Sequence, residues 1–203
     1  MKYIALWLVG ICVAVFILQN IYPSITDSFA LVSANVLQAP WTLITHMFLH
    51  GSFEHLFYNM FALALFGTIL EGIIGSKRFL ILYFVSGLIA ALGSVMFYSA
   101  SIGASGAIMG VLGCLAVLRP KMTVYLSYIP MPMIIATVVW AAGDLVGMFA
   151  PDEIAHAAHL FGMVFGIAVG LYYRKRFADH TRKYRIGSIP ENEAREWENK
   201  WIT

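Results

Sequence analysis

Charged residues are scarce in this sequence. Asp, Glu, Lys and Arg make up 12% of its 203 residues, whereas 60% are hydrophobic; soluble domains carry about 25% charged residues. A water-soluble fold of this length lacks the polar surface to cover so much apolar material. The composition therefore excludes an ordinary soluble domain and indicates that the bilayer is the solvent for most of the chain.

Cysteine is also nearly missing. The two cysteines, Cys12 and Cys114, both lie within apolar runs, where a cysteine behaves as a small hydrophobic residue. The sequence therefore indicates no disulfide framework, and we assign neither thiol a function.

Six apolar runs follow one another along the chain, separated by short polar segments or by proline and glycine. They lie at approximately residues 3–22, 52–71, 79–98, 105–118, 133–150 and 154–173. The runs lack the alternation of strands, and only helices or closed barrels satisfy every backbone group in lipid. We therefore predict an all-α bundle of six transmembrane helices over residues 1–173. The run 105–118 would cover only about 21 Å as a helix, so Ser105 is expected to lie below the membrane surface.

Lysine and arginine are missing from every second connection. If both termini are cytoplasmic, all thirteen Lys and Arg lie on the cytoplasmic side, and the opposite loops carry only acidic charges, namely Asp27, Glu54, Asp152 and Glu153. This asymmetry follows the positive-inside rule and predicts cytoplasmic termini. Residues 1–20 are then a retained anchor rather than a cleaved signal peptide, because losing that span would place the basic C-terminal residues outside.

Residues 174–203 form a charged segment that we predict to be a cytoplasmic tail. Ser188 and Glu191 make a capping box that could begin a short helix, with Trp197 and Trp201 on one face. Such a helix would suit the cytoplasmic membrane surface, and a solvated tail is the alternative.

Polar residues inside membrane spans are functional candidates, because lipid makes them costly. His55 falls about one turn into the second run and Asn59 one turn further on the same face, while His159 lies at a similar depth in the sixth run and Ser105 begins the fourth. Serine chemistry needs a base for the hydroxyl proton and donors for the developing oxyanion. These four residues supply both.

Small residues give Ser105 and His159 a reason to meet. Glycines recur at small-xxx-small spacing in the fourth and sixth runs, at Gly106, Gly110, Gly113, Gly162 and Gly166. This spacing allows close helix packing in lipid. Packing these faces together would bring Ser105 and His159 to one end of the interface. The elbow G-x-S-x-G of soluble hydrolases is not met, since position 107 is Ala.

Four ordered motifs over approximately residues 40–170 resemble the rhomboid intramembrane proteases. The family's His-x-x-x-x-His-x-x-x-Asn is present as His50, His55 and Asn59. An acidic residue followed by glycine and a basic residue is present as Glu71, Gly75 and Lys77 or Arg78. The remaining two motifs are Gly103-Ala104-Ser105-Gly106 and Ala158-His159 followed by Gly162 and Gly166.

The resemblance implies an intramembrane serine endopeptidase that cuts transmembrane proteins within the lipid bilayer. Ser105 would be the nucleophile and His159 the general base of a dyad, and His55, Asn59 and the Ser105 backbone N–H would form the oxyanion hole. Supporting residues would be His50, Gly103, Gly106, Gly162 and Gly166. No cofactor, metal or nucleic-acid partner is implied, and a prokaryotic cell (inner) membrane is the expected location.

The external segment 23–51 resembles the family's loop that lies partly embedded in the outer leaflet, and its amphipathic character suits an interface. It departs from the family in one place, because Trp41 is followed by Thr42 and many rhomboids have arginine there. We therefore expect the loop to be anchored differently.

Two other function classes are open. A metal-dependent membrane enzyme or transporter could use His156 and His159 with His46 and His50, although the sequence contains no H-E-x-x-H and pairs no carboxylate obviously with these histidines. A noncatalytic rhomboid relative could bind membrane proteins without cutting them. Asp144 could orient a histidine as a third triad member, but a structural hydrogen bond or a cavity-facing role is the favoured interpretation.

Overall fold

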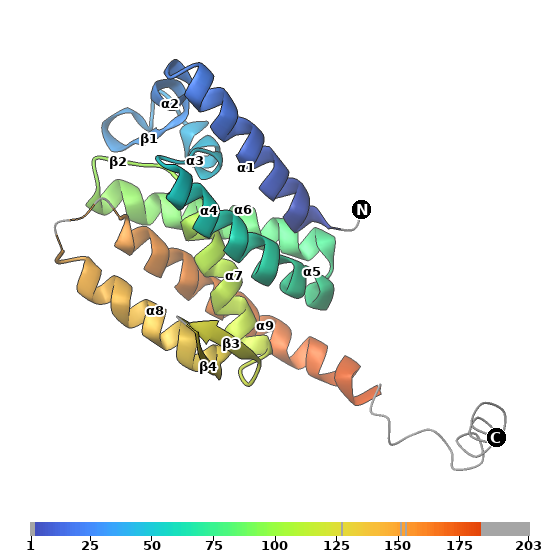
Figure 1. The fold of residues 1–203 in the computed structure, drawn as a ribbon. Helices are drawn as coiled ribbons and strands as arrows, with labels where there is room; N and C mark the ends of the chain where they lie inside the picture. The colour runs from blue at the N-terminus through green and yellow to red at the C-terminus, as the bar shows by residue number, and fades with distance from the viewer. Residues whose placement is uncertain (1–2, 127, 151, 153, 184–203) are drawn as a thin grey trace, which may run out of the picture.

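The computed structural model describes residues 3–126, 128–150, 152 and 154–183, the last nine of them by their backbone alone. It is built mainly of helices (Figure 1). The α-helices are α1 (Ile4–Ile21), α2 (Ser24–Phe29), α3 (Thr42–Thr45), α4 (Phe53–Ala62), α5 (Thr68–Ile74), α6 (Ser76–Phe97), α7 (Ser105–Leu118), α8 (Met133–Gly147) and α9 (His156–Lys183). Short 3₁₀ turns η1 (Ser33–Asn35) and η2 (His46–Phe48) lie in the first loop, and the π-helical η3 (Leu63–Gly67) joins α4 to α5.

Within the described residues, four helical segments are long and apolar enough to cross a membrane. They are Ile4–Ile21, Phe53–Ile74, Ser76–Phe97 and His156–Arg174. Helices α7 and α8 are apolar but shorter. All six predicted runs are therefore helical, and α7 has the predicted bounds of 105 and 118. Helix α9 continues to Lys183, ten residues past the predicted end of its run; Ser188, Glu191, Trp197 and Trp201 of the predicted tail helix lie outside the described residues.

Short strands occur in the connections, where the sequence pattern shows no sign of them. Strand β1 (Leu31–Val32) pairs antiparallel with β2 (Ala100–Ser101), and β3 (Thr123–Leu126) forms a hairpin with β4 (Ile129–Pro132). Segments of two to four residues are too short to show a period of two. The β1–β2 pair ties the first loop to the segment that leads into α7.

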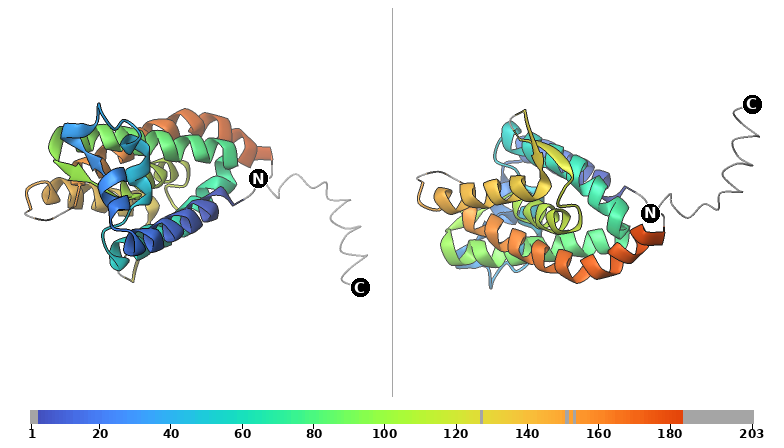
Figure 2. Two further views of the ribbon diagram at one scale, coloured as in Figure 1. Left: turned by 90° about the horizontal axis from the view of Figure 1, so that it is seen from above. Right: turned by 90° about the horizontal axis from the view of Figure 1, so that it is seen from below.

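Helix α7 lies at the centre of the bundle, with α6, α8 and α9 packed around it (Figures 1 and 2). Its contact with α9 is made through glycine. A Cβ added to Gly162 would clash with the carbonyl oxygen of Gly106, and one added to Gly166 would clash with that of Gly110. The predicted packing of the two glycine faces is confirmed, and it holds the backbones of α7 and α9 in direct contact.

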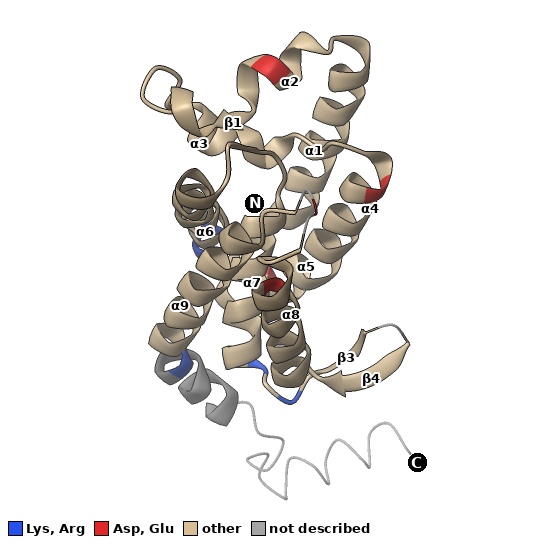
Figure 3. Ribbon diagram, turned by 90° about the vertical axis from the view of Figure 1, so that its left-hand side faces the viewer, with Lys and Arg blue, Asp and Glu red and all other residues tan. Residues whose placement is uncertain are grey.

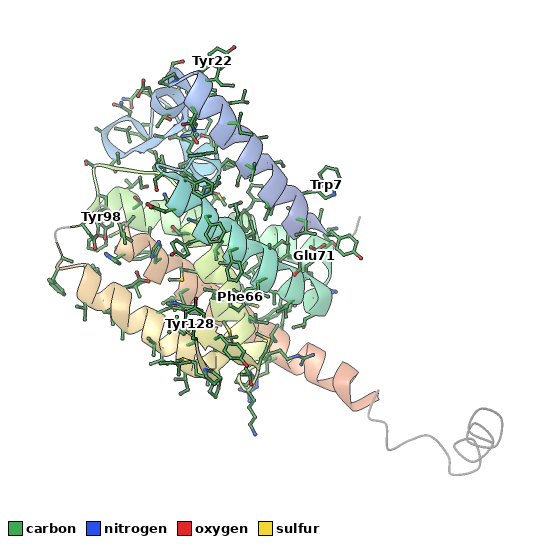
Figure 4. All side chains as sticks on the ribbon, in the orientation of Figure 1. Trp7, Tyr22, Phe66, Glu71, Tyr98 and Tyr128 are labelled. Carbon is green, nitrogen blue, oxygen red and sulfur yellow. The ribbon has the colours of Figure 1, made fainter. Side chains whose placement is uncertain are left out.

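Glu71, on α5, fixes the position of the start of α1. Its two carboxylate oxygens accept hydrogen bonds from the N–H groups of Ile4 (2.9 Å) and Ala5 (3.0 Å), the first residues of α1. Figure 4 shows Glu71 beside that end of the helix. A carboxylate at a helix N-terminus satisfies free donors and complements the helix dipole. The buried Glu71 therefore has a structural role that explains its presence in an apolar helix.

Charges of opposite sign lie mostly toward opposite ends of the described part of the molecule. Figure 3 shows acidic segments on α2 and α4 toward one end and basic segments near the start of β3 and on α9 toward the other, with a further acidic segment near α7 and α8 and a basic one by α6 in between. The loop beside Ser105 lies at the acidic end, since β1 follows α2 directly and pairs with β2.

Candidate active site

Ser105 and His159 face each other across the interface of α7 and α9. Ser105 is the first residue of α7, and His159 is in the first turn of α9. The Ser105 Oγ lies 2.7 Å from the His159 Nε2, at hydrogen-bonding distance. The glycine contacts one turn below hold both helices at this separation. The structure thus brings together the two residues that the sequence placed at one level.

Asp144, on α8, lies on the far side of the His159 ring. Its Oδ1 is 2.9 Å from the His159 Nδ1. An ionised carboxylate only accepts, so Nδ1 is assigned the proton and Nε2 keeps the lone pair that accepts the Ser105 hydroxyl. The sequence interpretation considered that Asp144 could orient a histidine but favoured a structural hydrogen bond or a cavity-facing role; the structure shows that Asp144 pairs with His159, which the sequence does not make obvious. Helices α8 and α9 meet only in the folded chain, so no sequence spacing reveals the pair.

His156 lies between two carboxylates. Its Nδ1 is 2.7 Å from the same Asp144 Oδ1, and its Nε2 is 3.1 and 3.2 Å from the two oxygens of Asp152. Because neither carboxylate donates, both ring nitrogens are donors and His156 is assigned as an imidazolium. The N–H of Ile154 also donates to Asp152 (3.0 Å). That N–H and the His156 ring lower the pKa of the Asp152 carboxyl below its usual range.

His55 lies against the segment that leads into Ser105. Gly103 has a φ of +123°, and a Cβ there would lie 2.8 Å from the His55 ring. Both the backbone conformation and the space therefore require glycine. The His50 ring packs edge-on against His55, with 5.1 Å between ring centroids. Burial lowers the pKa of His50 to about 4, with a smaller contribution from the charge of His55, so His50 is neutral near pH 7.

Asn59 lies on the same face of α4 as His55, as its spacing predicts. Its Nδ2 donates to the backbone carbonyl of His55, at 2.8 Å, so this donor is engaged within its own helix. The side chain is buried. The structure thus ties the Asn59 amide to the His55 backbone one turn earlier in α4.

A small cavity of about 20 Å³ borders Ser105. Its lining includes His46, Ser94, Ser101 and Gly103. A water molecule needs roughly 10–15 Å³ of such space and polar partners, so one water fits here.

The location of His46 also corrects the metal hypothesis. Among the described residues, the histidines His156 and His159 share their cluster with Asp144 and not with His46 or His50.

The first loop is anchored by a residue that none of the sequence motifs includes. The Gln19 side chain accepts from the N–H of His50 (3.1 Å) and donates to the Thr26 hydroxyl (2.9 Å). Trp41 donates its indole N–H to the carbonyl of Ser28, at 3.3 Å. Gln19 is buried near the end of an apolar helix. Because a buried amide needs hydrogen-bond partners, this position in the sequence could have identified Gln19 as an anchor.

Tyr98 supports the start of α9. Its hydroxyl accepts a hydrogen bond from the N–H of Ala157, at 3.0 Å. Figure 4 shows Tyr98 beside the connection from α8 to α9. This contact fixes the turn of α9 that carries His156 and His159.

Comparison with known proteins gives consistent matches. The model of the Rhomboid domain matches residues 37–176. "Rhomboid protein 1, mitochondrial" of Saccharomyces cerevisiae is 33% identical over 83% of this chain and 52% of its own length. The "Putative rhomboid protease YdcA" of Bacillus subtilis is 33% identical over 62% of this chain and 63% of its own. The "Rhomboid protease GlpG" of Yersinia pseudotuberculosis is 26% identical over 80% of this chain and 59% of its own. The chain thus spans less than two thirds of the length of these relatives.

Proposed function

This chain belongs to the rhomboid family of integral membrane proteins, and from this premise we propose that it is an intramembrane serine endopeptidase. It would hydrolyse peptide bonds in or next to transmembrane segments of membrane proteins. The observation that carries the proposal is the hydrogen bond of 2.7 Å between Ser105 and His159. A noncatalytic membrane-protein binder needs neither a nucleophile nor a base. Turnover of a model transmembrane substrate by the purified protein in liposomes tests the proposal.

The reaction follows from the donors and acceptors at the site. As the Ser105 Oγ attacks the scissile carbonyl, its proton moves to the His159 Nε2, and His159 then gives that proton to the leaving amine. A water from the cavity beside Ser105 then attacks the acyl-enzyme, with His159 again accepting and returning the proton, and the second product is released. A helical substrate hides its carbonyls in hydrogen bonds, so the segment to be cut must unwind first. Substrates with small or helix-breaking residues near the cut are therefore expected.

The oxyanion of this reaction would be stabilised from α4 and α7. The Ser105 N–H is among the first of α7, where no helical carbonyl accepts it. His55 and Asn59 would supply side-chain donors, Asn59 by releasing the carbonyl that it contacts in the free protein. Hydrogen bonds of this kind often form only when substrate binds.

His55→Ala and Asn59→Ala should each slow cleavage without changing the cut site. Loss of one oxyanion donor costs about 10²–10³-fold in kcat. Steady-state kinetics on one substrate, with His159→Ala as the inactive reference, measure the effect. If the double variant turned over like the wild type, His55 and Asn59 would be packing residues only.

Asp144 would hold His159 in the tautomer that the reaction needs. Asp144→Asn keeps the side-chain volume but replaces an obligatory acceptor by a group that can donate, which favours the other tautomer. The same change in a soluble serine protease lowers kcat by about 10⁴-fold. We expect a loss of kcat on the order of 10²-fold or more with KM unchanged. An unaltered kcat in a folded Asp144→Asn protein would reduce Asp144 to a structural role.

We also propose the six-span arrangement with both termini in the cytoplasm. It is supported by the separation of acidic and basic segments in Figure 3 and by the apolar α7 and α8 beside the four longer candidate spans. Residues 1–173 would form the membrane domain and 174–203 a cytoplasmic tail. The relatives include bacterial and mitochondrial proteins, and a prokaryotic cell membrane remains our proposal for this chain.

Reporter fusions test that topology. A reporter attached at residue 76 or 203 should remain cytoplasmic, and one inserted near residue 152 should be exported, because basic residues are retained inside. An exported reporter at residue 203 would contradict the six-span arrangement.

A further inference from the structure

Three side chains beside the nucleophile form a group suited to a metal ion. Asp144, His156 and His159 each present a ligand atom, and these atoms all lie within 4.8 Å of one another. Both imidazole Nδ1 atoms point to the same carboxylate oxygen, at 2.7 and 2.9 Å. Two imidazoles and one carboxylate are a ligand set that Zn²⁺ accepts, with ligand atoms about 3.3 Å apart around a tetrahedral ion. The two nitrogen–oxygen distances would lengthen by a few tenths of an ångström around such an ion, and the two rings would adjust within the 4.8 Å that now spans the cluster.

The second oxygen of Asp144 gives an independent indication. Asp144 is 6% exposed, and its Oδ2 is buried without a hydrogen-bond partner among the described residues. A buried carboxylate oxygen without a partner is costly. A cation that is bound by both oxygens of this carboxylate and by the two rings would satisfy it.

Asp152 adds the support that metal-binding histidines usually have. A histidine that binds a metal through one ring nitrogen generally donates the other N–H to a carboxylate, which fixes its orientation. Here the His156 Nδ1 faces the cluster and its Nε2 faces Asp152, which the Ile154 N–H holds in place. The Asp152 side chain is 39% exposed, so the outer edge of the cluster is open to solvent. The proteolytic reaction uses neither His156 nor Asp152.

We propose that Asp144, His156 and His159 bind a divalent cation of the zinc class and that this cation inhibits proteolysis. The inhibitory effect rests on the proposed serine protease function, whereas binding itself does not. The cluster thereby differs from a catalytic metal centre, because the ion would occupy the general base instead of activating water.

The movement of protons explains the inhibition. On binding the ion, His156 loses its Nδ1 proton to solvent and keeps the Nε2 proton that it donates to Asp152. His159 binds the ion through Nδ1 and carries its single proton on Nε2. That nitrogen then donates and has no lone pair for the Ser105 proton. In the metal-bound protein, Ser105 would therefore have no base to accept its proton.

The first experiment measures cleavage in liposomes at defined free Zn²⁺, using protein purified without a histidine tag. Zn²⁺ should inhibit the wild type, EDTA should restore activity, and Mg²⁺ should have no effect, because Mg²⁺ prefers oxygen ligands. His156→Ala should cleave like the wild type without Zn²⁺ but need at least about tenfold more Zn²⁺ for half-inhibition. Asp152→Asn should shift half-inhibition by about tenfold, as outer carboxylates do. Equal Zn²⁺ sensitivity in the wild type and a folded His156→Ala protein would overturn the proposal.

The second experiment measures binding without activity. Co²⁺ should give the intense visible absorption of a tetrahedral site in the Ser105→Ala protein, and Zn²⁺ should displace it. The spectrum should be lost in Ser105→Ala/His156→Gln, with thermal unfolding confirming that this protein is folded. Absence of the spectrum from Ser105→Ala would overturn the metal site even if the wild type is a protease. A spectrum in a wild type that cleaves no substrate would support the site and count against the proposed function alone.

Discussion

Ser105→Ala should abolish proteolysis and leave the protein folded. Removing the nucleophile of a soluble serine protease lowers kcat by a factor on the order of 10⁶, and a similar loss is expected here. The cost in stability should be small. The residue that precedes α7 is Ala104, and within the described part of the chain no side chain caps this helix, so the hydroxyl is not a helix cap. Its loss removes the hydrogen bond to His159, worth about 0.5–1.5 kcal/mol.

Labelling links this loss to chemistry at the site. A mechanism-based serine reagent should modify Ser105 in the wild type, and modification should fall sharply in His159→Ala, which lacks the base. His156→Ala is the matched control one turn away on the same helix, and it should retain substantial activity. Chelators should not reduce cleavage. Full proteolysis by a folded, contamination-free Ser105→Ala protein would end the proposed mechanism.

Helices and their packing faces were predictable because each depends on local spacing. Apolar runs show where the chain prefers lipid, and Gly106, Gly110, Gly162 and Gly166 at small-xxx-small spacing show where two backbones can touch. Because Ser105 and His159 flank those glycines at the same end, their meeting followed from the packing. The spacing of small residues along two helices was therefore enough to predict this pair.

Contacts between distant elements were not predictable in this way. Asp144 lies on α8 and reaches His159 on α9 only because both helices pack at α7. The spacing of residues along the sequence does not reveal such a contact between two helices. The contact of Asp152 with His156 is different, because it joins residues only four apart in the chain. The position of Gln19 in an apolar run indicated that its amide needs a partner. The sequence did not reveal that this partner is the backbone N–H of His50 in the first loop. The nucleophile, the base and the proposed donors were thus recognisable by residue type and spacing, whereas the contact of Asp144 with the base depends on how α8 and α9 pack.

Gly162→Ala should disrupt both stability and activity, although it adds a single methyl group. The new Cβ would meet the carbonyl oxygen of Gly106, which is backbone and has no side-chain rotation to relieve the clash. Helix α9 must move away from α7, and overpacking of this kind typically costs about 1–3 kcal/mol. The movement would separate the His159 ring from Ser105, and a displacement of about 1 Å at reacting groups can cost 10²-fold in rate.

Gly10→Ala is the matched control for that change. Gly10 also lies inside a helix, α1, but a Cβ there would meet none of the described residues within 4 Å. Alanine is the better helix former by about 1 kcal/mol, so Gly10→Ala should unfold no earlier than the wild type and cleave at the same rate. Thermal unfolding and cleavage are measured for both variants in the same lipid. Wild-type unfolding and turnover in Gly162→Ala would show that α7 and α9 are not in backbone contact, and the distance between Ser105 and His159 would then lose its structural basis.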